Sequence, residues 1–181
     1  MLKKIVAIGP ESTGKSNLCA QLAVHYKSKW VKEYAREYLL TNGTNYKYED
    51  LLKIAEGQIK EEETISRELL SSPLTTTHLP LLFIDTDLTV IKVWSEFVFN
   101  KCENSILSQI AKRPYDLYLL CNIDLPWVED DLREYPDLHS RKKLFHYYKD
   151  LLVNQQVPWV EISGNYEERL TKAINAVNKL I

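Results

Sequence analysis

The sequence has 181 residues, of which 45% are hydrophobic and 27% are charged, and this composition is typical of a globular protein with one domain. The 23 basic and 25 acidic side chains give a formal net charge of −2, so the chain lacks the basic field expected of a nucleic-acid-binding protein. Its three cysteines form no Cys-x-x-Cys pair, which argues against a disulfide framework and a zinc ribbon.

The N-terminal region carries no recognisable targeting signal. Its apolar run stops at Gly9 and is too short for the core of a signal peptide. No segment of the sequence approaches the roughly 20 consecutive apolar residues that cross a bilayer. We therefore expect a cytoplasmic protein with no membrane partner and no nucleic-acid partner, and the sequence leaves its oligomeric state open.

Short apolar segments alternate with helical patterns along the chain. The expected strands cover residues 3–8, 30–31 with their neighbours, 81–84, 117–121 and 158–162. The first, third and fourth are continuously rather than alternately apolar, as in strands covered on both faces. The expected helices cover residues 16–26, 48–70, 144–153 and 167–180. This alternation predicts one α/β domain over residues 1–181, with a five-stranded parallel sheet between two layers of helices, a three-layer α/β/α fold.

Three segments do not fit this alternation. Residues 41–47 and 71–80 are expected to form loops, the first polar and the second leading into the third strand. Residues 122–141 are long, charged and interrupted by prolines. Because irregular segments of this length are usually binding loops or lids, we expect a lid over about residues 123–143.

The motif at residues 9–16, GPESTGKS, matches G-x-x-x-x-G-K-[S/T] in full. A strand is expected before it and a helix after it, the context in which this phosphate-binding loop works. Its main-chain N–H groups would wrap the phosphates of ATP, Lys15 would reach the β- and γ-phosphates, and the Ser16 hydroxyl would bind Mg²⁺. The residues expected to bind the nucleotide here are Gly9, Glu11, Ser12, Thr13, Gly14, Lys15, Ser16 and Asn17.

A second acidic site follows the third expected strand, which ends in Asp85, with Asp87 two residues later. An acid at this place is the Walker B arrangement, which holds Mg²⁺ beside the phosphate-binding loop. We expect Asp85 to bind Mg²⁺ with Ser16, and Asp85 or Asp87 to accept the proton of an attacking hydroxyl. The alternative is that either aspartate caps the helix expected to begin near Leu88.

Two classes of P-loop protein are disfavoured. The residues after Cys121 lack the lysine of the guanine-reading motif of GTPases, and Asp85 is not followed by the glycine of their D-x-x-G motif. A motor or AAA-type machine would normally be longer and carry sensor elements, which we do not find. A small-molecule phosphotransferase remains, with Arg133 and Arg141 of the expected lid as ligands of the transferring phosphoryl group. The choice between ATP and GTP stays open, and both arginines could instead belong to a solvated charged surface.

Four segments are distinctive when taken together: GPESTGKS, EYAREYL at residues 33–39, Asp85-Thr86-Asp87 followed by Trp94, and YDLYLLCNIDLPWVEDDLR at residues 115–133. They resemble the ribosylnicotinamide kinase domain of NadR-type proteins, over most of the chain. The resemblance implies a P-loop kinase fold and transfer of the γ-phosphate of ATP to the ribose 5′-hydroxyl of nicotinamide riboside, giving nicotinamide mononucleotide in NAD salvage. Because the first strand begins at residue 3, we expect the kinase alone, without the adenylyltransferase or repressor domains often fused to it.

The resemblance also suggests residues for the acceptor and for the adenine. Glu33, Tyr34 and Arg36 would hold the riboside or the neighbouring phosphate, and aromatic side chains would stack on the cationic nicotinamide ring unless they simply pack in the core. Gly164, after the last strand, lies where such kinases hold adenine. The full set expected to bind the acceptor is Glu33, Tyr34, Arg36, Tyr38, Trp94, Trp127 and Asp130.

Two other functions stay open at this point. The chain could phosphorylate a different nucleoside or a nucleotide, which a panel of acceptors would reveal. It could also be a regulatory module that binds ATP, turns over little and signals through a partner.

Overall fold

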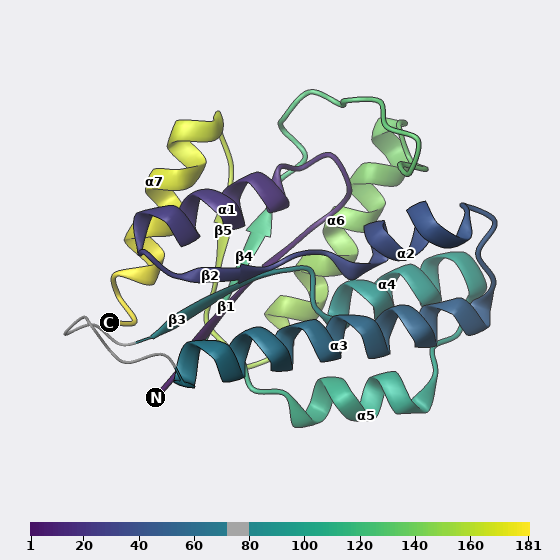
Figure 1. Ribbon diagram of the computed structural model, residues 1–181. Helices are drawn as coiled ribbons and strands as arrows, with labels where there is room; N and C mark the ends of the chain where they lie inside the picture. Colours follow the sequence, from purple (N-terminus) through teal and green to yellow (C-terminus); the bar gives the residue numbers. More distant parts are fainter. Residues whose placement is uncertain (72–79) are drawn as a thin grey trace.

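The structure is a computed structural model that describes residues 1–71 and 80–181. Helices flank a central sheet (Figure 1). The described elements are, in chain order, β1 (Lys3–Ile8), α1 (Lys15–His25), β2 (Lys29–Val31), α2 (Tyr34–Asn42), α3 (Tyr48–Ser71), β3 (Leu81–Asp85), α4 (Leu88–Phe99), α5 (Asn104–Lys112), β4 (Leu117–Cys121), α6 (Leu138–Val153), β5 (Trp159–Ile162) and α7 (Tyr166–Val177).

The strands of the sheet are all parallel and lie in the order β2-β3-β1-β4-β5, which confirms the predicted five-stranded parallel sheet. Strand β1 is central, and its Ala7 lies opposite Asp85 of β3 and opposite Leu119 of β4. The carboxyl ends of these three strands therefore meet at one edge of the sheet. In open parallel sheets a ligand site usually lies outside this edge, where the strand order reverses.

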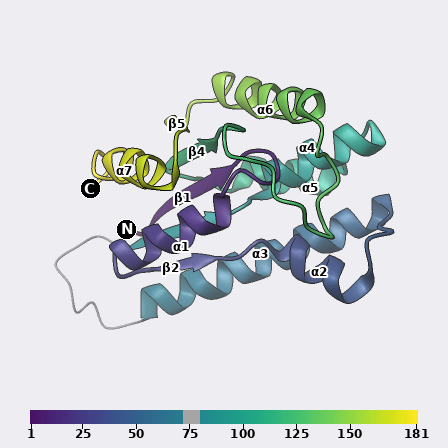
Figure 2. The same ribbon diagram turned by 90° about the horizontal axis from the view of Figure 1, so that it is seen from above.

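The two faces of the sheet carry separate parts of the core (Figure 2). On β1, Ile5 and Ala7 point toward α1 and α7, whereas Val6 and Ile8 point toward α4, α6 and the end of α3. This alternation follows from the two-residue period of a strand, and it completes the predicted three layers. A third cluster joins α2, α3, α4 and α5 to one another. Within the described ranges, every helix is too short or too polar to cross a bilayer.

Several boundaries differ from the predicted ones. Helix α6 begins at Leu138, six residues earlier than expected, because the Asp137 side chain caps it by accepting the Ser140 N–H at 2.8 Å. Arg141 therefore belongs to α6 and not to a lid. Thr41 and Asn42, expected in a loop, end α2 and donate to carbonyls one turn back.

Helix α5 was not predicted, because only Ile106 of its nine residues is buried. Most of the predicted 71–80 loop, residues 72–79, lies outside the described residues.

The packing of α2 on α3 depends on a glycine. A Cβ added to Gly57 of α3 would lie 2.0 Å from Cε1 of Tyr34, at the start of α2. The Tyr34 N–H also donates to the Gln58 carbonyl oxygen Oε1 at 2.8 Å. The missing side chain at Gly57 thus lets the Tyr34 ring lie directly on the backbone of α3.

We expect Gly57→Ala to lower the free energy of unfolding by about 1–3 kcal/mol, because the new methyl overlaps the Tyr34 ring. In a Tyr34→Ala background the overlap is gone, and the same substitution should raise stability by about 0.5–1 kcal/mol, the usual gain of Ala over Gly in a helix. Urea unfolding of the four proteins measures both effects. A loss of the same size in both backgrounds would contradict this account.

Candidate active site at the carboxyl edge of the sheet

The P-loop (residues 9–16) joins β1 to α1 and is held by its own polar groups. The Lys15 ammonium donates to the carbonyls of Gly9 at 3.0 Å and Pro10 at 2.9 Å, and the Thr13 hydroxyl donates to the Pro10 carbonyl at 2.7 Å. Gly14, with φ +76°, precedes the first residue of α1. The first N–H groups of a helix have no partner within it and favour anions, so this end of α1 suits a phosphate group.

Gly9 is required by a close contact between neighbouring strands. Its φ is +138°, and an added Cβ would lie 2.6 Å from the Cys121 carbonyl oxygen at the end of β4. Any other residue would push the backbone of the P-loop away from β4. The first glycine of the motif is therefore needed for the packing of the sheet as well as for the loop.

Asp85 lies at the end of β3 and is 1% exposed. Its Oδ1 has no hydrogen-bond partner among the described residues. Burial and, to a smaller extent, the nearby Glu33 carboxylate raise the pKa of Asp85 to about 7, although Lys15 and a hydrogen bond with Ser16 oppose the rise. A buried carboxylate oxygen without a partner, beside a hydroxyl, is costly unless a ligand completes the site.

This pair of oxygen donors fits Mg²⁺. Mg²⁺ usually takes one or two protein oxygens and fills its remaining positions with water and substrate phosphates. Ser16 and Asp85 supply two such oxygens next to the P-loop. The part of the chain that the structure describes contains no cluster of three His, Cys, Asp or Glu side chains that could hold a metal without a phosphate.

Asp87 differs from Asp85, although both were expected in catalysis. It caps α4 and accepts hydrogen bonds from the Thr89 N–H at 3.0 Å, the Thr89 hydroxyl at 2.8 Å and the Tyr118 hydroxyl at 2.9 Å. Its carboxylate is thus satisfied by the protein, and among the described residues it lines neither the cavity at the P-loop nor the smaller hollow that Asp85 lines. This corrects its assignment: the capping alternative fits Asp87.

A cavity of about 590 Å³ lies in front of the P-loop, a volume typical of small-molecule sites. The P-loop and Asn17 form one wall, and α2, α4, α6 and the β4–α6 loop (residues 122–137) form the others. A smaller hollow beside it shares Ser16, Glu33 and Arg36 and is lined by Asp85. Of the residues expected to bind the acceptor, the cavity brings together Glu33, Arg36, Trp94 and Asp130.

Three expected aromatic residues lie elsewhere. The Tyr34 ring lies on Gly57, and the Tyr38 hydroxyl donates to Asp50 at 2.8 Å, so both pack on α3 and do not line the cavity. The Trp127 ring lies against the guanidinium groups of Arg141, at 5.3 Å, and Arg133, at 6.0 Å. Contacts within the protein thus account for the positions of these three rings.

Sequence reasoning missed aromatic residues that do line the cavity. They are Phe97, Tyr135, Tyr148 and Tyr166, and the Phe97 and Tyr135 rings meet edge to face with centroids 5.2 Å apart. One signal was available, because Phe97 follows Trp94 by three residues on α4 and therefore shares its face. The others come from distant segments, which no local pattern connects.

The β4–α6 loop is docked on the P-loop and on α2. The Glu11 carboxylate accepts the N–H groups of Glu134 and Tyr135, each at 3.0 Å, and the Ser12 hydroxyl accepts the Val128 N–H at 3.0 Å. Burial raises the pKa of Glu11, and these two N–H bonds oppose that rise. At the rim, Arg36 forms a two-bond ion pair with Asp130, at 2.7 and 3.2 Å. The loop therefore covers the cavity.

The two arginines expected in a lid have different positions. Arg133 lines the cavity, and its guanidinium lies 3.4 Å from the Ser12 hydroxyl. Arg141 is 5% exposed on α6 and donates to the Ile123 carbonyl at 3.4 Å, and burial lowers its pKa. Arg133 is thus the better placed of the two for a phosphate, and Arg141 supports the start of the loop.

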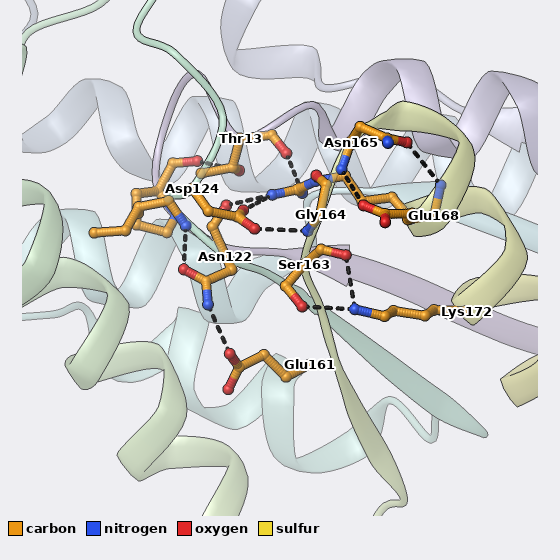
Figure 3. A network of polar contacts seen from close by, with 12 residues as sticks. Thr13, Asn122, Asp124, Glu161, Ser163, Gly164, Asn165, Glu168 and Lys172 are labelled. Carbon is orange, nitrogen blue, oxygen red and sulfur yellow. Dashed lines mark hydrogen bonds and ion pairs between the residues drawn. The ribbon is translucent and has the colours of Figure 1, made fainter.

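Gly164 takes part in a polar network beside the P-loop (Figure 3). Its N–H donates to the Asp124 carboxylate at 2.6 Å, and two residues later Tyr166 lines the cavity. The network also contains Arg169 of α7, which contacts the P-loop at Thr13. Sequence reasoning did not single out Arg169, because 156 residues separate it from Thr13.

Comparison with known proteins places this geometry among P-loop proteins. The chain is 22% identical to the trifunctional NAD biosynthesis/regulator protein NadR of Escherichia coli (strain K12), over 99% of this chain but 43% of that protein. Two solved structures share its fold. A NadR protein in complex with NR has a TM-score of 0.75 and 23% identity, and the match covers 98% of this chain and 49% of that one. Thymidylate kinase from Ehrlichia chaffeensis has a TM-score of 0.69 and 11% identity, with 97% and 98% covered.

The fold is therefore the P-loop kinase-like α/β fold that the sequence predicted, although the chain spans less than half the length of the NadR protein it matches. The family AAA_28, described as an AAA domain, matches residues 4–169. Its description was not expected, because the sequence interpretation set AAA-type machines aside on length and on missing sensor elements. Nevertheless, the match covers the P-loop, β3 with Asp85 and the β4–α6 loop, and the chain belongs to the AAA_28 family.

Proposed function

We propose that this protein is an ATP- and Mg²⁺-dependent kinase that phosphorylates the 5′-hydroxyl of nicotinamide riboside. One observation carries the proposal: the P-loop opens into a covered cavity lined by aromatic and charged side chains, and Asp85 lines the smaller hollow beside it, which shares Ser16 and Glu33 with the cavity. The likeness to NadR proteins supports the acceptor, since one was solved with NR and another with NAD and AMP-PNP. The proposal concerns the kinase step, and we further propose that it takes place in the cytoplasm.

The reaction joins the ribose 5′-oxygen to the γ-phosphorus of ATP and breaks the bond from that phosphorus to the bridging oxygen of ADP. Catalysis of such a transfer consists mainly of positioning and charge stabilisation. Lys15 would neutralise charge on the β- and γ-phosphates, and Arg133 would reach the transferring group from the β4–α6 loop. Ser16 and Asp85 would hold Mg²⁺, which would neutralise the charge that develops on the phosphate oxygens.

Glu33 is the carboxylate that we propose for the hydroxyl proton. It precedes α2, lines both hollows and is close enough to Asp85 to raise the pKa of that group. We thus propose different roles for the two acids: Asp85 would bind the metal, and Glu33, which lines the cavity, would accept the proton of the acceptor hydroxyl.

The far wall of the cavity suits a flat cationic ring. Trp94, Phe97 and Tyr135 present aromatic faces and edges, and Asp130 and Glu134 add negative charge. A pyridinium ring gains about 0.5–2 kcal/mol from an aromatic face. We propose that the nicotinamide ring binds here, in place of the ring positions at Tyr34, Tyr38 and Trp127 that the sequence suggested.

The first test is release of ADP with ATP, Mg²⁺ and a panel of nucleosides that includes nicotinamide riboside. We expect turnover with that riboside and a loss of about 100-fold or more in Lys15→Ala, because an electrostatic contact to the reacting phosphates is removed. Lys149→Ala is the matched control, since Lys149 pairs with Glu161 away from the cavity. Turnover with another acceptor alone would contradict the substrate, and ATP binding without any turnover would favour a regulatory module.

Asp85→Asn tests the metal site. We expect kcat to fall by about 100-fold or more, because a buried metal ligand loses its charge. Mg²⁺ should also strengthen AMP-PNP binding to the wild type and no longer do so in the variant, as measured by calorimetry. Asp116→Asn is the control, because Asp116 accepts bonds from Lys3 and Lys4 at the other end of β1. An unchanged response to Mg²⁺ in Asp85→Asn would refute this assignment.

Glu11→Ala tests whether docking of the β4–α6 loop supports the reaction. The substitution removes the acceptor of two N–H groups, so we expect proteolysis within residues 122–137 to rise by about tenfold and the KM for the acceptor to increase. Glu129→Ala removes an exposed carboxylate from the same loop and should change neither. Equal cleavage rates in the wild type and Glu11→Ala would mean that Glu11 does not hold the loop.

A further inference from the structure

Arg169 of α7 connects three loops at the edge of the sheet. It is 3% exposed, and its guanidinium donates to the carbonyls of Thr13, Asn122 and Gly164 at 2.9, 2.9 and 2.8 Å. These acceptors belong to the P-loop, to the β4–α6 loop and to the connection between β5 and α7. Figure 3 shows Thr13, Asn122 and Gly164 converging on one point from separate parts of the chain.

A carboxylate balances the buried charge. Asp124 forms an ion pair with Arg169, and its second oxygen accepts the Gly164 N–H at 2.6 Å. A buried guanidinium is tolerated only when it is paired and its N–H groups are satisfied. The planar fork of Arg, with donors in fixed directions, meets these acceptors at once, which the single ammonium of Lys cannot do.

The bond to Thr13 fixes the direction of a neighbouring donor. A trans peptide is planar, so the Thr13 carbonyl and the Gly14 N–H point in opposite directions. Arg169 holds the carbonyl on the side of α7, which turns the Gly14 N–H to the opposite side of the same peptide. Gly14 needs such a restraint because glycine at φ +76° has no side chain that would limit its rotation.

We infer that Arg169 is a positioning residue for the phosphate-binding loop, which orients the Thr13–Gly14 peptide for phosphate. It acts through Thr13 and does not itself contact the nucleotide. The inference rests on nucleotide binding by the P-loop, as proposed above, and is independent of which acceptor is phosphorylated. It also ties the P-loop to Gly164, so both loops move with α7.

The test compares Arg169→Lys with Arg113→Lys. Arg113 is a matched control, because it is also largely buried and pairs with Glu62 and Glu63 of α3, but it lies outside the residues that line the cavity. Binding of inorganic tripolyphosphate and of AMP-PNP is measured by calorimetry well below the unfolding temperature of each protein. The Gly14 amide resonance in a ¹H–¹⁵N spectrum reports on the peptide directly.

We expect Arg169→Lys to weaken tripolyphosphate binding by about tenfold or more, the usual effect of losing a hydrogen bond from a charged group. The KM for the acceptor that the wild type phosphorylates should stay within about twofold, since we propose that the acceptor binds at the far wall of the cavity and not at this peptide, and the Gly14 resonance should shift. Arg113→Lys should lower the unfolding temperature without these changes. If Arg169→Lys does not fold, Asp124→Asn should give the same changes in smaller measure.

Two results would overturn the inference. One is wild-type affinity for tripolyphosphate with an unmoved Gly14 resonance in Arg169→Lys. The other is an equal loss of affinity in Arg113→Lys at the same loss of stability, which would assign the effect to the fold as a whole. Failure of the wild type to bind tripolyphosphate and AMP-PNP is a separate result, which would refute the proposed function and this inference with it.

Discussion

The contact between Gly9 and the Cys121 carbonyl sets the geometry of the whole site. It keeps the ends of β1 and β4 together up to the start of the P-loop, where a Cβ would leave only 2.6 Å to the carbonyl oxygen. Pairing of β1 with β3 brings Asp85 to the same edge. Three segments that are distant in sequence therefore meet at one edge of the sheet because their strands are parallel and adjacent.

The buried polar side chains near the site differ in whether the protein satisfies their hydrogen bonds. Asp87 and Arg169 are satisfied by protein donors and acceptors, and each of them fixes a helix end or a loop. Asp85 keeps a buried oxygen without a partner among the described residues. Such a group costs free energy in the folded protein, so stability does not account for this oxygen, and it fits the metal-binding role that we propose for Asp85.

The sequence was informative wherever a function depends on a short continuous pattern. The P-loop, its flanking strand and helix, and Asp85 were all predicted correctly in place, because spacing along the chain fixes them. Asp85 and Asp87 could not be separated from the pattern, since residues two apart on a strand share a face. Thr86 breaks the strand with φ +71°, and this turn directs Asp87 to the cap of α4.

Residues that come to the site only through tertiary contacts could not be predicted from the sequence. Arg169, Tyr135 and Tyr148 reach the site from different elements, and no local spacing connects them to the P-loop. The start of α6 could have been found from Asp137, whose capping role is a local signal, and this would have removed Arg141 from the expected lid. Helix α5 is amphipathic but only nine residues long, and Ile106 is its one buried side chain.

The ion pair between Arg36 and Asp130 closes the outer rim of the cavity and so bears on how a small molecule reaches the P-loop. The Arg36 side chain is 49% exposed and that of Asp130 is 21% exposed, so solvent screens this pair more than it would a buried one. The bonds at Glu11 and Ser12, closer to the P-loop, hold the same loop at its inner side. Separation of this pair would open the outer rim of the cavity while the loop stays bonded at its inner side, and salt, which screens exposed charges, would weaken the pair at the rim.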